Sequence, residues 1–150
     1  MHIVSQLLGA KRRWSGGEKG VETILGDRSV LDAARKMNEA RIGSLVVTDR
    51  RDRVAGIITE RDMLTRVIAA GRDPSATPVE AVMTREVYVC GPGETLDGLR
   101  REMRSRRIRH VPVLEGDRLA GLVSIGDLNA AEHEDLEITI RVMEEYITHG

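Results

Sequence analysis

The strongest constraint on this sequence is that its two halves repeat each other. Residues 29–47 align without a gap with residues 95–113, and after one residue is dropped in a turn, residues 52–62 align with residues 117–127. Identical residues at matching positions include the pairs Arg35 and Arg101, Met37 and Met103, Arg41 and Arg107, and Asp62 and Asp127. Self-similarity of this kind is the signature of a tandem repeat, so we predict two copies of one unit of roughly 60 residues.

Both units predict the same order of elements, β-α-β-β-α. A hydroxyl residue, Ser29 or Thr95, precedes apolar residues at helical spacing, where its side chain can cap a helix. Two short aliphatic strands follow, and a second helix is predicted to begin at Thr59 and at Ser124. The predicted strands span residues 21–25, 45–48 and 54–58 in the first unit and 87–90, 111–114 and 119–123 in the second. The predicted fold class is therefore α+β, with two β-α-β-β-α repeats and a C-terminal helix.

Local composition divides the chain into four segments. Residues 71–78 are rich in Pro, Gly and Ser and are predicted to form a linker, after which a short helix is predicted at Val79–Met83. The predicted segments are a first repeat with an N-terminal segment at 1–70, the linker at 71–78, a second repeat at 79–131 and a C-terminal helix at 132–150.

The C-terminal helix carries an apolar stripe formed by Leu136, Ile140, Met143 and Ile147. An apolar helix face needs something to cover it, so we expect this one to pack on the rest of the chain or on a second copy. Pairing through the helices, including this stripe, would give a homodimer of closed symmetry.

The overall composition argues against several classes of protein. Of the 150 residues, 41% are hydrophobic and 31% are charged, so the chain can bury a core. The net charge of −1, with no Phe, one Trp and two Tyr, argues against a protein that stacks nucleic-acid bases. A single cysteine, Cys90, cannot build an intrachain disulfide framework. No apolar run approaches the roughly 18 residues of a membrane span, so we expect a soluble, cytoplasmic protein.

One short motif occurs in both repeats, as residues 56–62 and residues 121–127. In each, an aliphatic strand ends in a hydroxyl residue, and an aspartate follows three positions later, on the same side of a helix's first turn. The N-terminus of a helix favours anions, and a carboxylate can accept two hydrogen bonds from a vicinal diol, which is the chemistry of a ribose-phosphate site. The alternative is a structural capping box, in which the hydroxyl and the carboxylate each cap the other residue's backbone.

The two units resemble a tandem pair of cystathionine-β-synthase (CBS) domains, or Bateman module, of the stand-alone bacterial type. The resemblance is carried by Met83-Thr84, by residues 108–113 and by the two motifs ending in Asp62 and Asp127. It implies a pseudo-twofold arrangement of the repeats, with clefts between them that hold an adenosine-containing ligand such as AMP, ATP, NAD or S-adenosylmethionine.

The resemblance also implies roles for individual residues. Asp62 and Asp127 would hold ribose hydroxyls, with Thr59 and Ser124 near the ribose or phosphate. Adenine would lie among the short strands around Ile24, Leu45, Val87 and Val89. The remaining nucleotide-binding residues that it implies are Lys11, Arg61, Met83, Thr84, Arg109, His110 and Pro112.

The two repeats differ where phosphate would bind. Arg61 in the first repeat corresponds to Gly126 in the second, and Gly43-Ser44 corresponds to Arg109-His110. The cationic side chains are therefore distributed unequally, and we expect one site to bind better than the other.

No catalytic motif or run of metal ligands accompanies these residues, so we expect neither enzyme activity nor a catalytic cofactor. The predicted function is a regulatory module that binds an adenine nucleotide and signals to an unknown regulated protein by conformational change. Two alternatives stay open. The chain could be a scaffold with vestigial clefts, or a CBS protein that binds RNA or DNA through the arginine-rich segment Arg100–Arg109.

Overall fold

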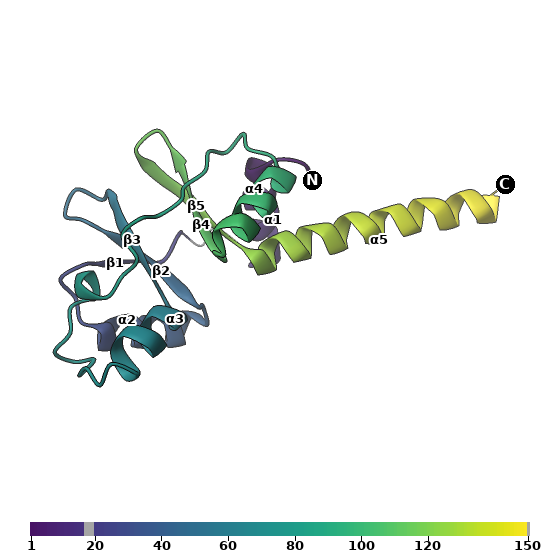
Figure 1. Cartoon of the computed structure of the whole chain (residues 1–150). Helices are drawn as coiled ribbons and strands as arrows, with labels where there is room; N and C mark the ends of the chain where they lie inside the picture. Colours follow the sequence, from purple (N-terminus) through teal and green to yellow (C-terminus); the bar gives the residue numbers. More distant parts are fainter. Residues whose placement is uncertain (17–19, 150) are drawn as a thin grey trace. The chain divides into compact units, whose positions relative to one another are not determined.

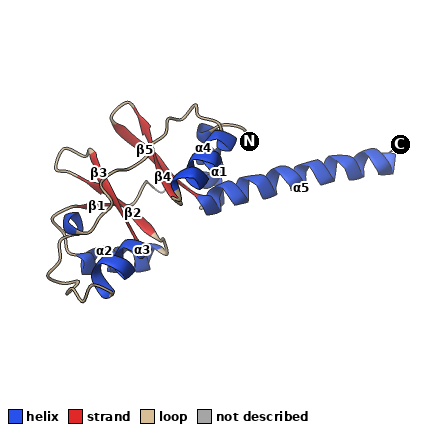
Figure 2. Cartoon of the chain, viewed as in Figure 1, coloured by secondary structure: helices blue, strands red, loops and turns tan. Residues whose placement is uncertain are grey.

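The structure, a computed structural model, describes residues 1–16 and 20–149. Figures 1 and 2 show mixed helices and strands, which confirms the predicted α+β class. The elements in chain order are α1 (Val4–Trp14), β1 (Thr23–Leu25), α2 (Val30–Ala40), β2 (Ser44–Thr48), β3 (Val54–Thr59), α3 (Glu60–Met63), the π-helix η1 (Leu64–Ile68), the 3-10 helix η2 (Val79–Ala81), α4 (Leu96–Arg106), β4 (His110–Glu115), β5 (Arg118–Ser124) and α5 (Ile125–His149).

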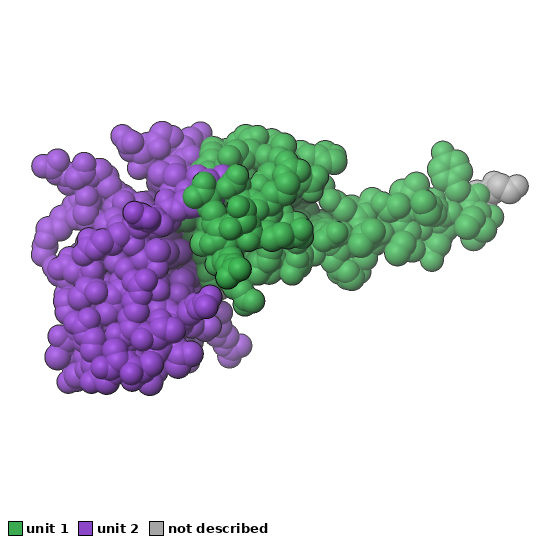
Figure 3. Space-filling model, in the orientation of Figure 1, with its two compact units in different colours: residues 1–19, 90–113, 121–150 green, residues 20–89, 114–120 purple. Residues whose placement is uncertain are grey.

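The chain forms two compact units, coloured separately in Figure 3. Unit 1 consists of residues 1–19, 90–113 and 121–150, and unit 2 consists of residues 20–89 and 114–120. Helix α1 thus belongs with the second repeat rather than with the first, beside which it lies in sequence. The reason is packing and pairing: Val4, Leu7 and Ala10 are buried, and the backbone N–H of Leu96 donates to the carbonyl of His2.

Unit 2 is built on a three-stranded sheet in the order β1-β2-β3. Strand β1 runs parallel to β2, with Ile24 opposite Val47, and β2 pairs antiparallel with β3. All five residues of this central strand β2 are buried, and Leu45, Val46 and Val47 form an aliphatic run between Ser44 and Thr48. The core packed against the sheet comes from α2, η1 and η2 and includes Met37, Val67 and Val79.

The helices α2 and α4 begin and end alike. Their predicted N-caps are confirmed, because the hydroxyl of Ser29 accepts from the N–H of Asp32 at 3.0 Å and that of Thr95 accepts from the N–H of Gly98 at 3.1 Å. Each helix ends at an arginine in the left-handed conformation, Arg41 or Arg107, both with φ of 54°.

The second repeat departs from the prediction at its leading strand. Of residues 87–90, only Cys90 takes part in a β-bridge, an isolated parallel one with Val113. The Gly91-Pro92-Gly93 turn that follows ends the pairing after Cys90, since proline has no N–H to donate. The short helix predicted at Val79–Met83 is likewise only the 3-10 turn η2.

Helix α5 is longer than the predicted C-terminal helix, because it begins directly after Ser124 and continues without a break to His149. Leu128 and Ala131 near its start are buried, but the stripe residues Leu136, Ile140 and Met143 are 56–60% exposed. The stripe therefore does not pack on the other elements of unit 1. Coverage by a second copy stays a prediction.

Candidate functional site

In unit 2 the predicted ribose-binding aspartate closes a capping box at the end of β3. The hydroxyl of Thr59 accepts from the N–H of Asp62 at 3.2 Å, and Oδ2 of Asp62 accepts from the N–H of Thr59 at 3.0 Å. Asp62 is only 7% exposed. The structural alternative, a capping box, is therefore present. A carboxylate has about four lone-pair positions, so this cap leaves acceptor capacity on Asp62.

The Met83-Thr84 segment is tied to the same aspartate. The hydroxyl of Thr84 donates to Oδ1 of Asp62 at 3.2 Å, while the backbones of Thr84 and Ile57 exchange two hydrogen bonds of 2.9 and 3.0 Å. Arg66 donates to the carbonyls of Val82 and Met83 at 3.1 and 3.0 Å, and its Nε lies 3.9 Å from Oδ1 of Asp62. These contacts fix Asp62, Thr84 and Met83 as one cluster.

Arg66 is a member of this cluster that the sequence motifs did not identify. Its position four residues after Asp62 in a helical segment is the signal that could have identified it, since residues at i and i+4 are neighbours on a helix.

In unit 1 the second aspartate closes a capping box at the start of α5. The hydroxyl of Ser124 accepts from the N–H of Asp127 at 3.1 Å, and Oδ2 of Asp127 accepts from the N–H of Ser124 at 2.8 Å. The first N–H of α5, from Ile125, donates to the carbonyl of Arg109. In unit 2 the N–H of Glu60 and the carbonyl of Gly43 form the equivalent hydrogen bond.

Lys11 reaches this second aspartate from the last turn of α1. Its ammonium lies 2.8 Å from Oδ2 of Asp127 and donates to the carbonyl of Leu122 at 2.6 Å. The side chains are partly accessible, at 33% for Lys11 and 19% for Asp127. A ligand that approaches Asp127 therefore meets a carboxylate that already holds a cation.

The predicted site residues fall into two sets. Unit 1 holds Lys11, Arg109, His110, Pro112, Ser124 and Asp127, whereas unit 2 holds Ile24, Leu45, Thr59, Arg61, Asp62, Met83, Thr84, Val87 and Val89. Within each unit the structure brings an aspartate, a hydroxyl and a cation together. In unit 1 the cation is the predicted Lys11, whereas in unit 2 it is Arg66.

The other predicted residues differ in accessibility. The side chains of Arg61 and Arg109 are exposed, His110 and Val87 are half-buried, and Val89 is 37% exposed. Ile24 and Leu45, expected near adenine, belong to the core of unit 2, and Leu45 has no accessible surface. Pro112 is buried, and its carbonyl accepts from the N–H of Cys90 at 3.0 Å.

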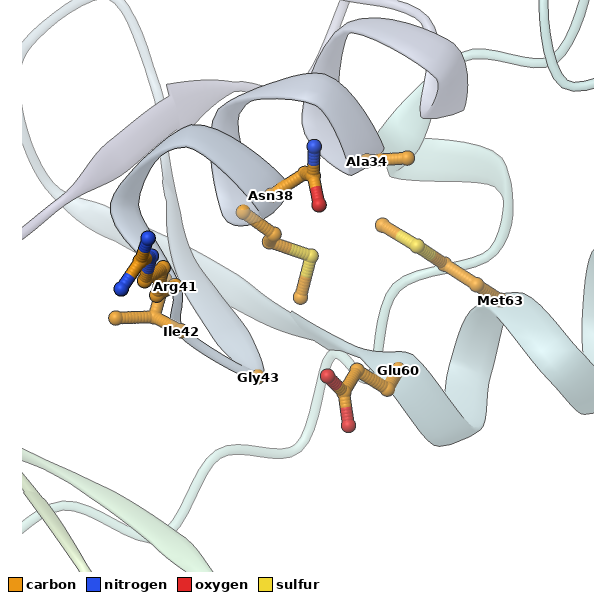
Figure 4. A pocket seen from close by; sticks show the side chains of 8 residues that line it. Ala34, Asn38, Arg41, Ile42, Gly43, Glu60 and Met63 are labelled. Carbon is orange, nitrogen blue, oxygen red and sulfur yellow. The ribbon is translucent and has the colours of Figure 1, made fainter.

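A separate cavity of about 500 Å³ opens on the helical side of unit 2, and Figure 4 shows the side chains around it. It is lined by residues of α2 and α3 and of the turn between α2 and β2, namely Ala34, Met37, Asn38, Arg41, Ile42, Gly43, Glu60 and Met63. None of these is a predicted nucleotide-binding residue, so the cavity is distinct from the Asp62 cluster.

Other residues considered from sequence have structural partners. In the arginine-rich segment, Arg106 pairs with Glu102 at 2.8 Å, and Arg100 contacts Asn129 and Glu132. These pairings are those of a solvated helix face. Burial and the nearby Glu94 carboxylate raise the pKa of the Cys90 thiol to about 12.

Among residues 1–16 and 20–149, no helix combines the length and the apolar character that crossing a bilayer requires.

Solved structures similar to this chain share its fold over most of its length. A CBS-domain protein from Burkholderia ambifaria, described as acting in signal transduction, is 41% identical, with a TM-score of 0.82 over 89% of this chain and 95% of that one. The CBS-domain containing protein ATU1752 from Agrobacterium tumefaciens is 39% identical, with a TM-score of 0.78 over 87% of this chain and 93% of that one.

Two relatives from Arabidopsis thaliana carry the same domain in longer chains. The mitochondrial CBS domain-containing protein CBSX3 of Arabidopsis thaliana is 36% identical over 129 residues, which are 83% of this chain but 62% of that protein. The chain spans about a fifth of another Arabidopsis relative, CBSCBSPB3. The sequence pattern of the CBS domain itself matches residues 18–69 and 79–146. The chain therefore belongs to the CBS-domain family and carries two CBS repeats in tandem.

Proposed function

We propose that this chain is a regulatory module that binds an adenosine-containing nucleotide and signals its occupancy by a change of conformation. The observation that carries the proposal is the Asp62 cluster. A buried, oriented carboxylate with lone pairs to spare stands beside a hydroxyl at a helix start, and it is locked to Met83-Thr84. A rigid acceptor of this kind suits the two hydroxyls of a ribose.

The second repeat supports a weaker or different site of the same kind. Asp127 repeats the hydrogen bonds of Asp62 within its capping box, but Lys11 occupies Oδ2. A nucleotide that uses Asp127 must share this oxygen with Lys11 or displace it. The exposed guanidinium of Arg109 supports a contact to phosphate on this side.

AMP, ATP, NAD and S-adenosylmethionine present the same adenosine to such a carboxylate, so the ribose contact does not select among them. The regulated partner is not encoded in these residues either. A ligand shifts the protein from one conformation to another only if it binds the second more tightly than the first. The size of the signal therefore depends on the ratio of the ligand's affinities for the two conformations.

The test is a thermal-shift panel with AMP, ADP, ATP, NAD and S-adenosylmethionine, together with mass spectrometry of any nucleotide that co-purifies. A ligand at about 100 times its Kd adds about 2.7 kcal/mol to the free energy of unfolding. For a chain of this size, that raises the Tm by about 5–10 °C.

The matched variants are Asp62→Asn and Asp127→Asn, each compared with its own ligand-free Tm because both also alter a cap. Asp32→Asn, in the first turn of α2, is the control for the loss of one carboxylate charge. We expect at least one motif variant to lose the ligand-induced shift while Asp32→Asn keeps it. No shift with any nucleotide, and none co-purified, would favour the scaffold with vestigial clefts.

A further inference from the structure

The second half of α5 carries an unusually apolar exposed surface. Large hydrophobic side chains there are between 47% and 81% exposed. They are Leu136, Ile138, Ile140, Val142, Met143, Tyr146 and Ile147. Figure 3 shows this part of α5 extending beyond the other atoms of unit 1. We define residues 136–147 as the α5 extension.

The extension is amphipathic, with a polar side that is mainly acidic. That side carries three glutamates and one cation, namely Glu137, Glu144, Glu145 and Arg141. A helix that lies on an anionic membrane needs Lys and Arg on its polar face, so the charge of this side opposes a lipid surface. The occupant of the apolar side is therefore a protein.

The apolar side has the properties of a self-complementary interface. Thr139 is the one polar residue among its apolar side chains, and no charged residue interrupts it. Across a twofold axis the same patch of both copies comes together. A charged patch would therefore be repelled by the like charges of its copy, whereas an uncharged apolar patch meets no such repulsion.

The spacing of the apolar residues also fits a helical pair. Leu136, Ile140, Met143 and Ile147 follow one another at intervals of four, three and four, the spacing of a coiled-coil seam. In heptad terms the β-branched Ile140 and Ile147 take the a positions, and Leu136 and Met143 take the d positions. Within a parallel coiled coil, β-branched residues at a with leucine-like residues at d favour two strands over three or four.

The flanking charges select the orientation of the two helices. Glu137 and Glu144 occupy e positions, whereas the g positions hold Thr139 and Tyr146. In an antiparallel pair the e positions would face each other and bring glutamates together. In a parallel pair each glutamate faces an uncharged g residue of the other helix.

We propose that the α5 extension is a self-association surface, on which the α5 extension of a second copy packs in parallel. This association does not depend on nucleotide binding.

The first experiment measures the molar mass of the full chain by light scattering between 5 and 100 μM. We expect at least twice the chain mass of 16.6 kDa. The variant Ile140→Glu/Met143→Glu should weaken association at least 100-fold. It should keep the helical circular dichroism, because both side chains are exposed within the single chain. Arg141→Glu places a new glutamate on the polar side and should leave association unchanged.

The second experiment tests orientation by disulfide cross-linking in a Cys90→Ala background. Met143→Cys should cross-link to itself under mild oxidation, because a d position meets its own copy in a parallel pair. Arg141→Cys on the polar side should not. A monomer throughout the concentration range, a mass insensitive to the double glutamate variant, or no Met143→Cys cross-link would each overturn the proposal.

Discussion

The equivalent glycines Gly56 and Gly121 predict unequal responses to the same substitution. A Cβ on Gly56 would lie 2.6 Å from Sδ of Met83 and 2.7 Å from the carbonyl oxygen of Thr84. A Cβ on Gly121 would lie 2.6 Å from Cδ2 of Leu8. Both contacts are too short to persist, but the end of a leucine side chain can rotate away. The Thr84 carbonyl cannot move without breaking its hydrogen bond from the N–H of Ile57.

Gly56→Ala should therefore lower the free energy of unfolding by about 2–3 kcal/mol, in the upper part of the range for overpacking, and Gly121→Ala by about 1 kcal/mol or less. For a chain of this size, the Tm should fall by about 4–12 °C in Gly56→Ala and by at most about 4 °C in Gly121→Ala. Urea denaturation monitored by circular dichroism measures both changes. Since Gly56→Ala pushes Thr84 away from Asp62, it should also weaken any nucleotide that binds there.

A second substitution checks the stated cause. Leu8→Ala should remove most of the cost of Gly121→Ala, because it deletes the atoms that collide. Met83→Ala should not rescue Gly56→Ala, because the backbone oxygen of Thr84 stays in place. A Gly121→Ala variant at least as unstable as Gly56→Ala, or a Gly56→Ala variant rescued by Met83→Ala, would refute the reasoning.

Three further predictions follow from single residues. Lys11→Met leaves the partly buried carboxylate of Asp127 without its cation and should cost about 1–2 kcal/mol in urea denaturation; an unchanged midpoint would contradict this. Arg107→Gly should stabilise the chain by about 0.5–1 kcal/mol, because glycine adopts the left-handed conformation without steric cost; lower stability would show that the arginine side chain matters more. The Cys90 pKa of about 12 lies above that of an unfolded thiol, so the free energy of unfolding should fall between about pH 9 and 12 as the unfolded thiol ionises first. Alkylation by iodoacetamide at pH 8 should be slow in the folded chain and fast in urea, and equal rates would contradict the burial.

Features encoded by local pattern could be predicted from the sequence. The caps at Ser29 and Thr95, the aliphatic strand β2 and the buried pair Met37 and Met103 follow from spacing and residue type. The left-handed helix ends could not be predicted in this way. Glycine usually occupies such positions, and here arginine does.

Features that depend on contacts between residues far apart in the chain could not be predicted from the sequence pattern either. The grouping of α1 with the second repeat depends on pairing between His2 and Leu96. The contact of Lys11 with Asp127 joins residues from opposite ends of the chain, and no periodicity predicts such a partner. For the same reason the sequence could place Asp62 and Asp127 in equivalent motifs, but it could not show that Lys11 is the cation that contacts Asp127.

Helix α5 connects the two proposals made for this chain. Asp127 lies in its first turn and the α5 extension begins nine residues later, about 14 Å along one unbroken helix. Helix α1 and the N-terminus of the chain contact the part of α5 between these two surfaces. Lys11 forms an ion pair with Asp127, the indole N–H of Trp14 donates to Glu134, and the N-terminal ammonium forms an ion pair with Asp135. A nucleotide that displaces Lys11 from Asp127 loosens one of these ties. If the orientation of α5 then changes, nucleotide affinity and self-association must alter each other by the same factor, because coupling between two binding events is reciprocal. An association constant that is identical with and without a bound nucleotide would show that α5 carries both surfaces but transmits nothing between them.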